Sequence, residues 1–295
     1  MENWLAADSK LFSRRSFLKT ALIGAGGLAL YAGEIERHWL EVVHQDISIK
    51  GLAPGFDGVK IAQLSDIHLE EFTESFLLRE AIEQINRARP DYVFLTGDFV
   101  TADVLPKRWS IKAAQRCGEL LSGLHCKERY TVFGNHDARA GELEVADALG
   151  DAKLIFLRNT HVPLERNGGR LWLAGIDDPV NGMPDQSAAI PESIRHIPNE
   201  PVILMCHAPD YIEVLRAHPT GQAISLVLSG HTHGGQIRMP FAGPLFLPSW
   251  GRKYVNGLFN VGSMQLYVNR GIGTVGVPFR FDCRPEITIF TLRSA

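Results

Sequence analysis

The sequence predicts an α/β protein in which two β-sheets face each other and helices cover their outer faces. Three observations predict this class. Short apolar runs alternate along the chain with segments of helical period. The apolar runs contain few polar residues, which indicates strands that are buried on both faces. The runs also fall into two groups, residues 59–157 and residues 171–292, and each group is expected to form one sheet.

The individual elements follow from these patterns. Strands are expected at residues 42–49, 59–64, 92–95, 130–133, 153–157, 171–174, 202–205, 224–228, 265–269 and 286–292. Helices are expected at residues 74–89, 111–121 and 142–149. In the first helix, apolar residues recur at helical spacing, Thr73 can cap the start, and Pro90 ends it.

The composition is that of an ordinary globular protein. The chain has 295 residues, of which 45% are apolar and 21% charged, and its net charge is −3. This length suits one large α/β domain. The slightly acidic balance argues against broad binding to nucleic acid. No internal repeat or low-complexity linker is present, so we expect one domain, residues 41–295, behind a leader, residues 1–40.

The leader matches the twin-arginine export pattern. Residues 13–19 read Ser-Arg-Arg-Ser-Phe-Leu-Lys, and an uncharged, Gly- and Ala-rich apolar stretch follows at residues 21–33. Such a stretch is long enough for an export signal, which needs about 7–15 apolar residues, but short for a spanning helix, which needs about 20. The alternative is an arginine pair that begins an ordinary buried helix.

Export would place the protein in the periplasm or on the outer face of the cytoplasmic membrane, with the twin-arginine machinery as a partner. No small-x-small cleavage site follows the apolar stretch, so the leader is expected to remain as a membrane tether. The four cysteines show no CxxC pair. Cys117 and Cys126 could form a disulfide outside the cytoplasm, but we favour buried free thiols.

Five polar clusters follow apolar runs that are predicted to be strands. They are Asp66-Ile67-His68, Gly97-Asp98, Gly134-Asn135-His136-Asp137, Cys206-His207 and Gly230-His231-Thr232-His233. In open α/β sheets, ligands bind at the carboxyl ends of strands, so clusters that are far apart in sequence can converge. Asp, Asn and His side chains bind hard-to-borderline divalent ions. Asp98 stands alone after its glycine, which suits a carboxylate that bridges two ions.

In order, these clusters read DxH, GD, GNHD, H and GHTH, and this pattern resembles the calcineurin-like metallophosphoesterases over roughly residues 59–240. The resemblance implies a four-layer α/β/β/α sandwich of two facing mixed β-sheets with a dinuclear metal centre. One ion would be held by Asp66, His68, Asp98 and His233, and the other by Asp98, Asn135, His207 and His231. His136 would face the substrate and stabilise its charge or protonate the leaving oxygen, and Asp137 could hold the His136 ring.

The resemblance also implies the chemistry, which is metal-dependent hydrolysis of a P–O bond. The cofactors would be two divalent ions, for which Mn, Fe and Zn all suit mixed nitrogen and oxygen ligands. A hydroxide that bridges the two ions would attack phosphorus, since its pKa is lowered. Each cluster alone could be a plain turn, a surface residue or a core histidine, and only the joint pattern predicts a site.

The substrate is less well determined than the reaction. The GHTHGGQ motif and the Pro-rich apolar loop that follows it are similar to those of the bacterial YkuE/YaeI-type phosphodiesterases. Related lipid A pathway enzymes, which cleave the pyrophosphate of UDP-2,3-diacylglucosamine, share the metal motifs and provide an alternative. The motifs do not separate diester, monoester and pyrophosphate cleavage. The phosphoester substrate is therefore left open and could be lipid-linked or contain a nucleotide.

The loop itself has two interpretations. Its apolar side chains could touch lipid or a membrane surface, or they could fold onto the core of the protein. They are Phe241, Leu245, Phe246, Leu247 and Trp250. Nearby cations could bind a second phosphate or simply be surface residues, and these are Arg238, Arg252 and Lys253.

Two other functional classes are less well supported. A metal-free protein-binding scaffold of the same fold would be expected to have lost ligands, and none is missing from the pattern. A nuclease would favour a basic groove, which the acidic composition does not predict, so no nucleic acid binding is expected.

Overall fold

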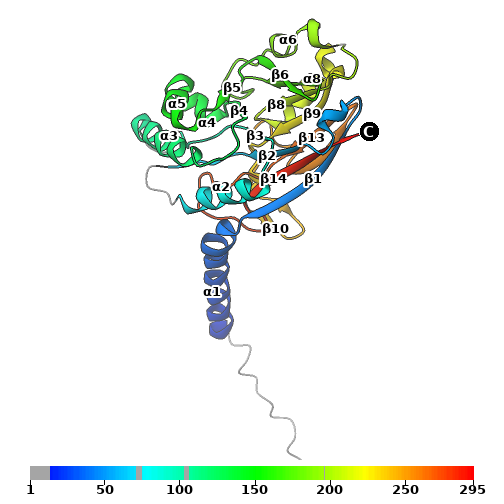
Figure 1. The fold of residues 1–295 in the computed structure, drawn as a ribbon. Coiled ribbons are helices and arrows are strands. Elements are labelled where there is room, and N and C mark those ends of the chain that lie inside the picture. Colours follow the sequence, from blue (N-terminus) through cyan, green and yellow to red (C-terminus); the bar gives the residue numbers. More distant parts are fainter. Residues whose placement is uncertain (1–13, 71–74, 103–105, 196) are drawn as a thin grey trace, which may run out of the picture.

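Two six-stranded mixed β-sheets face each other and form the body of the protein (Figure 1). The architecture is taken from a computed structural model, which describes residues 14–70, 75–102, 106–195 and 197–295. The predicted cap Thr73 and the first 13 residues of the leader lie outside these ranges. Apolar side chains fill three layers, one between the sheets and one under the helices on each outer face. This arrangement confirms the predicted four-layer sandwich.

The first sheet has the strand order β1-β14-β2-β3-β4-β5. Its strands are β1 (Glu41–Ile49), β14 (Glu286–Ser294), β2 (Lys60–Leu64), β3 (Tyr92–Leu95), β4 (Arg129–Thr131) and β5 (Ile155–Phe156). β14 runs parallel to β1 and antiparallel to β2, while β2, β3, β4 and β5 are parallel. The assignment of residues 286–292 to the second sheet was therefore wrong. An apolar run shows that a strand is buried, but not which sheet it joins.

The second sheet has the strand order β12-β13-β9-β8-β7-β6. Its strands are β12 (Gly257–Val261), β13 (Met264–Val268), β9 (Ile224–Ser229), β8 (Val202–Met205), β7 (Gly169–Gly175) and β6 (Thr160–Arg166). The pattern did not predict β6 and β12, which form the two edges. In both strands all residues but one are exposed or half-buried, so they lack the continuous apolar run of the central strands.

Helices cover the outer face of each sheet. The first sheet is covered by α2 (Phe76–Ala88), α3 (Lys107–Leu121) and α5 (Glu142–Ala148). The second is covered by short helices that the pattern did not predict, namely α6 (Gln186–Ala189), α7 (Glu192–Arg195) and α8 (Ile212–Ala217). These helices have four to six residues, which is too short to show a helical period. Cys117 and Cys126 are both free thiols, as favoured from the sequence.

The leader continues into the body of the protein. It forms α1 (Arg14–Leu30), a π-helical turn (Tyr31–Ile35) and a 3-10 turn (Glu36–His38) before β1 begins. α1 projects away from the sheets, and a small hairpin of β10 (Arg238–Met239) and β11 (Gly243–Pro244) lies at the same end of the body (Figure 1). Among the described residues, we find no helix with the length and apolar character needed to cross a membrane.

Candidate metal centre

The structure brings the seven predicted metal ligands together at the carboxyl ends of five strands. Asp66 follows β2, Asp98 follows β3, and Asn135 follows β4, all in the first sheet. His207 follows β8 and the pair His231 and His233 follows β9, in the second sheet. The parallel pairing of these strands aligns their ends, so side chains from up to 167 positions apart in the numbering meet at one place.

A single oxygen of Asp98 occupies the middle of this arrangement. Its Oδ2 lies 3.4 Å from His68 Nε2 and 3.1 Å from His207 Nε2. The other oxygen, Oδ1, accepts a hydrogen bond of 2.8 Å from the backbone N–H of His136. Because Oδ1 is held in this way, Oδ2 is left facing both imidazoles, which is the geometry required of a bridging carboxylate.

The remaining ligands form two groups around this oxygen. Asp66, His68 and His233 form one group, and Asp98, His207 and His231 form the other, with the possible ligand atoms of each group within 4.8 Å of one another. In the first group, His233 Nε2 lies 3.4 Å from Asp66 Oδ1. A third group, His68, Asp98 and His136, overlaps both, so His136, which was not expected to be a ligand, also lies within reach of this place. The division of the ligands between two ions stays a prediction.

The hydrogen bonds of two histidines fix which ring nitrogen faces the centre. His207 Nδ1 donates to Thr96 O at 2.7 Å, and His231 Nε2 donates to Ser249 O at 2.8 Å. A ring nitrogen that faces a carbonyl oxygen carries the proton, so His207 Nε2 and His231 Nδ1 are the nitrogens that a cation can bind. These two nitrogens are 3.2 Å apart, and His207 Nε2 also lies 3.1 Å from Asp98 Oδ2. Without a cation, a second proton on His207 Nε2 satisfies both neighbours.

Two buried polar atoms of the predicted ligands have no hydrogen-bond partner among the described residues. They are His68 Nε2 and Asn135 Oδ1. A buried acceptor without a partner costs about 1–3 kcal/mol. A divalent cation would satisfy both atoms, so the donor set fits the metal ions that the pattern predicted.

The electrostatics of the centre favour metal-binding charge states at Asp98, His231 and His233. At the other two groups they do not, because burial raises the pKa of Asp66 and, although burial opposes it, the nearby carboxylates of Asp98 and Asp66 hold the pKa of His207 well above its ordinary value. Burial opposes ionisation of Asp98, but the neighbouring imidazoles of His207 and His68 hold its pKa well below the ordinary value. Burial lowers the pKa of His231 to about 4 and lowers that of His233 well below its ordinary range. The bridging carboxylate is therefore charged and these two imidazoles are neutral at neutral pH.

The backbone of the centre is strained where it carries ligands. Five of the seven predicted ligands have a positive φ, and they are Asp66 (48°), His68 (46°), Asp98 (56°), His231 (72°) and His233 (51°). Residues other than glycine rarely adopt this conformation, which costs on the order of 1–3 kcal/mol each. Such strain persists only where the surrounding structure enforces it, and it is concentrated at functional sites.

Glycines allow the five loops to approach this closely. A Cβ on Gly134 would overlap Asp98 Oδ1, and a Cβ on Gly230 would overlap the side chains of Ser65 and Asp66. The glycines in the GNHD and GHTH clusters are thus required by the close packing of one loop against the next.

His136 lies beside the ligands, and its ring is held from one side. It lines the same cavity, and its ring packs edge-on against His68 with the centroids 4.9 Å apart. The backbone N–H of Ala102 donates to His136 Nδ1 at 3.0 Å. Arg139 Nη2 lies 3.1 Å from Nδ1 and 3.0 Å from Nε2 of the same ring, so a cation stands beside both nitrogens. Burial is the main cause that lowers the pKa of His136 to about 3.

Asp137 does not hold the ring of His136, as the resemblance had led us to expect. Its carboxylate instead accepts hydrogen bonds from the backbone N–H groups of Asp98 (2.7 Å), Phe99 (2.9 Å) and Gly134 (3.0 Å). Asp137 is fully buried and ties the loop after β3 to the loop after β4. It therefore positions the bridging residue Asp98 through the backbone.

A buried chain of side chains behind the ligands was missed in the sequence. Gln63 Nε2 donates to Thr96 Oγ1 (3.0 Å), Thr96 Oγ1 to Ser65 Oγ (2.7 Å), and Ser65 Oγ to Asp66 Oδ2 (2.6 Å). Gln63 Nε2 also donates to Ser229 O in the second sheet at 3.0 Å. The signal was present, because Gln63 is a polar residue within the apolar run of β2.

Five of the seven predicted ligands line a cavity of about 630 Å³, which also has an apolar wall; these five are His68, Asp98, Asn135, His231 and His233. The apolar wall consists of Val180, Ile237, Leu245, Phe246, Pro248, Val275 and Val277. Leu245 and Phe246 are 64% and 77% exposed. These side chains do not fold onto the core, so that interpretation of the loop is wrong for them.

The cations near this loop have partners elsewhere. Arg238 Nη1 donates to Asn256 Oδ1 at 2.7 Å, and Lys253 Nζ donates to Glu213 Oε1 at 2.5 Å. Arg238, Arg252 and Lys253 are not among the residues that line the cavity. The structure therefore gives no support to a second phosphate site at these three residues.

The chain is similar to known proteins. Residues 59–235 match the family described as calcineurin-like phosphoesterase. The chain is 34% identical over 295 residues to the uncharacterized metallophosphoesterase YkuE of Bacillus subtilis, covering 97% of this chain and 99% of that protein. It is 31% identical over 288 residues to the phosphodiesterase YaeI of Escherichia coli, covering 96% and 100%. Among solved structures, the calcineurin-like phosphoesterase YfkN from Bacillus subtilis aligns with a TM-score of 0.47 and 16% identity, covering 72% of this chain and 81% of that one.

We predict that Asp98→Ala abolishes metal binding at both ligand groups, because one oxygen of Asp98 serves both. His231→Ala, which changes only the second group, should lower the bound metal by about half. Metal content per chain, measured by mass spectrometry after dialysis against manganese or zinc, checks both variants. His125→Ala is the matched control, since this exposed histidine lies outside the cavity. Full metal content in Asp98→Ala would contradict the assignment.

Proposed function

Because the chain belongs to the calcineurin-like phosphoesterase family, we propose that it is a phosphodiesterase that hydrolyses a P–O bond with the help of two divalent ions. The observation that carries this proposal is the position of Asp98 Oδ2 between the inner nitrogens of His68 and His207. When bound at this centre, divalent ions supply Lewis acidity and a water of lowered pKa as the nucleophile. Manganese, iron and zinc all suit the ligand set.

The chain's own residues orient the substrate. The Ala102 N–H donates to His136 Nδ1, and we assign the proton of the neutral ring to Nε2, which Arg139 Nη2 approaches at 3.0 Å and which becomes a donor when Arg139 turns to the substrate. The ring can therefore donate a hydrogen bond to a phosphoryl oxygen and stabilise the charge that develops there. Asp137 and Ser65 hold the backbone and side chain of the two carboxylate ligands, so these need not reorganise during the reaction.

The cavity supports a diester more than a monoester. A diester carries one negative charge and two organic groups, and the apolar wall offers a surface for one of these groups. Apart from the imidazoles, the described residues that line the cavity include one cation, Arg139. A monoester has only one organic group and gains less from this wall. The relative YaeI is itself named a phosphodiesterase.

We predict that His136→Ala retains its bound metal but lowers kcat on bis(4-nitrophenyl) phosphate about 100-fold, as expected for loss of one hydrogen-bond donor to the transition state. His136→Gln should recover part of the loss, since its amide N–H can replace the Nε2–H. Steady-state kinetics with parallel metal analysis measure both. Wild-type turnover by His136→Ala would show that the ring has no part in the reaction.

The substrate class can be tested with the metal-reconstituted chain. We expect kcat/KM for bis(4-nitrophenyl) phosphate to exceed that for 4-nitrophenyl phosphate at least about tenfold, which corresponds to roughly 1.4 kcal/mol for contact of the second organic group with the apolar wall. UDP-2,3-diacylglucosamine serves as the third substrate. A preference for it would favour the alternative of a lipid-linked pyrophosphate hydrolase, and a preference for the monoester would contradict the diester proposal.

We also infer that the protein is exported by the twin-arginine route to the periplasm or the outer face of the cytoplasmic membrane. The support is the arginine pair Arg14 and Arg15, followed by the uncharged stretch at residues 21–33. A metalloenzyme that acquires its ions before export suits a route that carries folded proteins.

We predict that replacing both arginines by lysine, Arg14→Lys with Arg15→Lys, retains the protein in the cytoplasm although the charge is unchanged. Lys50→Arg, an exposed and charge-conserving change outside the leader, should not alter export. Cell fractionation with detection of the chain measures the distribution. Export of the double-lysine variant at the wild-type level would exclude this route.

A further inference from the structure

Exposed apolar side chains surround the mouth of the metal cavity, and we call them the apolar rim. The rim consists of Met239 (41% exposed), Phe241 (111%), Leu245 (64%), Phe246 (77%) and Val277 (47%). Leu245, Phe246 and Val277 also line the cavity, whereas Met239 and Phe241 lie on the hairpin of β10 and β11 outside it. Clustered exposed apolar side chains of this kind mark an interaction site rather than ordinary surface.

Hydrogen bonds join the backbone at Val275 and at Val277 of the rim to Gln236, which follows the predicted metal ligands. Gln236 Nε2 donates to Val275 O at 3.1 Å and to Val277 O at 2.9 Å, and the Val275 N–H donates to Gln236 Oε1 at 2.8 Å. Gln236 is only three residues after His233 and has a positive φ of 50°. The position of the rim is therefore set by the same loop that carries a predicted metal ligand.

Arg280 and Phe281, which come shortly after Val277, hold the base of α1. The Arg280 N–H donates to Ala32 O at 3.0 Å, and the rings of Tyr31 and Phe281 meet edge-on with centroids 6.4 Å apart. The Arg238 N–H, next to the rim, donates to Phe281 O at 2.9 Å. Residues 275–281 therefore contact both the loop that carries the rim and the base of α1. The hairpin of β10 and β11 and α1 lie at the same end of the body (Figure 1).

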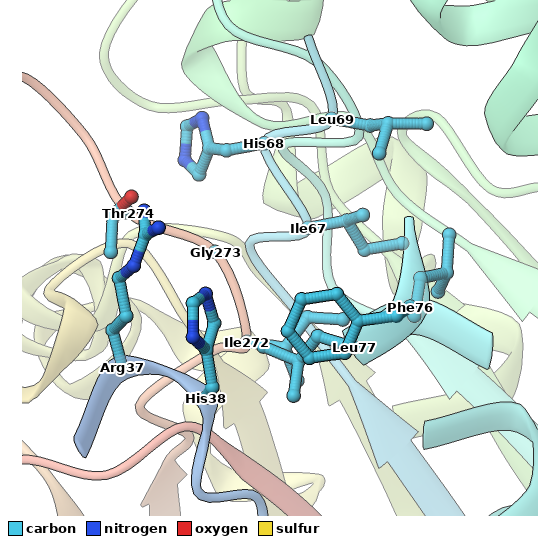
Figure 2. Close-up of a pocket in the computed structure, with 11 residues that line it drawn as sticks. Arg37, His38, Ile67, His68, Leu69, Phe76, Leu77, Ile272, Gly273 and Thr274 are labelled. Carbon is cyan, nitrogen blue, oxygen red and sulfur yellow. The ribbon is translucent and has the colours of Figure 1, made fainter. Parts of the chain in front are cut away.

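The end of the leader also packs beside the metal loop. Figure 2 shows Arg37 and His38 reaching from the leader into a pocket of about 260 Å³ that His68 lines from above. The His38 ring packs edge-on against Phe76 with centroids 4.8 Å apart. This second contact fixes the direction of α1 relative to the cavity.

The side chains of α1 indicate what covers this end of the molecule. Its exposed large apolar residues are Phe17, Leu18, Leu22, Ile23, Leu28 and Leu30. At about 3.6 residues per turn they lie on all sides of the helix. After Lys19 the helix carries no charge, and such a segment fits the acyl region of one leaflet without crossing the bilayer, whereas a protein groove would require one apolar face. Arg15 and Lys19, exposed at its start, suit anionic lipid headgroups.

We propose that the apolar rim is a membrane-docking surface that rests on the lipid bilayer entered by α1. The proposal rests on the contacts that join the rim to the base of α1. If α1 enters the bilayer, the same end of the body lies against the lipid surface, and the rim lies there too. The mouth of the cavity then faces phosphoester headgroups at the bilayer. This last consequence, that the substrate is a phosphodiester borne on lipid, rests on the proposed phosphodiesterase activity.

Docking is tested with an environment-sensitive dye on the full chain. The dye NBD is attached to Phe241→Cys or, as the control, to Leu143→Cys, an equally apolar residue that is 77% exposed on α5 and far from the rim. Both variants carry Cys126→Ser, since the other three cysteines are buried. With vesicles of phosphatidylcholine and phosphatidylglycerol, the emission at position 241 should rise several-fold and shift to shorter wavelength, and that at position 143 should not change.

Two results of this experiment would overturn the proposal. The dye at position 241 could remain in a water-like environment while the chain sediments with vesicles, which would show that α1 binds lipid without the rim. The emission could instead rise with protein concentration in the absence of vesicles, which would show that a second copy of the chain covers the rim.

A second experiment links docking to turnover. Phe241→Asn removes the most exposed rim side chain and keeps a residue type that tolerates its φ of 66°. Hydrolysis of a 4-nitrophenyl phosphatidyl diester in vesicles should fall about tenfold, given the apolar surface lost from the bilayer. Hydrolysis of soluble bis(4-nitrophenyl) phosphate should be unchanged, because Phe241 does not line the cavity.

The two proposals fail in different ways. If the wild-type chain hydrolyses neither ester, the proposed activity is wrong, while the dye at position 241 still decides docking. If Phe241→Asn hydrolyses the vesicle-borne ester at the wild-type rate, the rim has no role in presenting substrate, and the docking proposal is overturned.

Discussion

Oδ2 of Asp98 lies between the inner nitrogens of His68 and His207, and much of the local structure follows from holding it there. A buried carboxylate is stable only when it is paired and hydrogen-bonded. The His136 N–H binds one oxygen, Asp137 binds the Asp98 N–H, and the absence of a side chain at Gly134 leaves space for the carboxylate. Because His68 and His207 come from different sheets, this one group also ties the two halves of the fold together.

The two sheets are joined behind the ligands by a second polar connection. Gln63 in β2 binds Ser229 O at the end of β9 and begins the hydrogen-bonded chain that ends on Asp66. Around this polar layer the interior between the sheets is apolar. Each partner in such a layer is costly to bury without the others, so the ligands, their supports and the sheet register depend on one another.

The cavity combines a polar floor with an apolar wall, and these have different origins. Strand ends build the floor, and they are rigid because each strand is paired on both sides. Loops after β9 and β13 build the wall and the apolar rim, where Phe241 and Phe246 remain exposed. Such a division lets the chemistry at the floor stay constant while the loops decide which ester approaches.

The sequence by itself determined the fold class and the central strands and predicted the residues of the candidate site, because buried strands and clustered polar residues both leave local patterns. Runs such as 92–95 and 202–205 are apolar throughout, and each ligand cluster follows such a run. The tertiary structure decided what depends on partners distant in sequence. It placed β14 in the first sheet and formed the edge strands β6 and β12, which lack an apolar run. The tertiary structure also turned Asp137 toward backbone amides and left the rim exposed. Packing decides which groups a side chain contacts, and the neighbouring residues in the sequence do not.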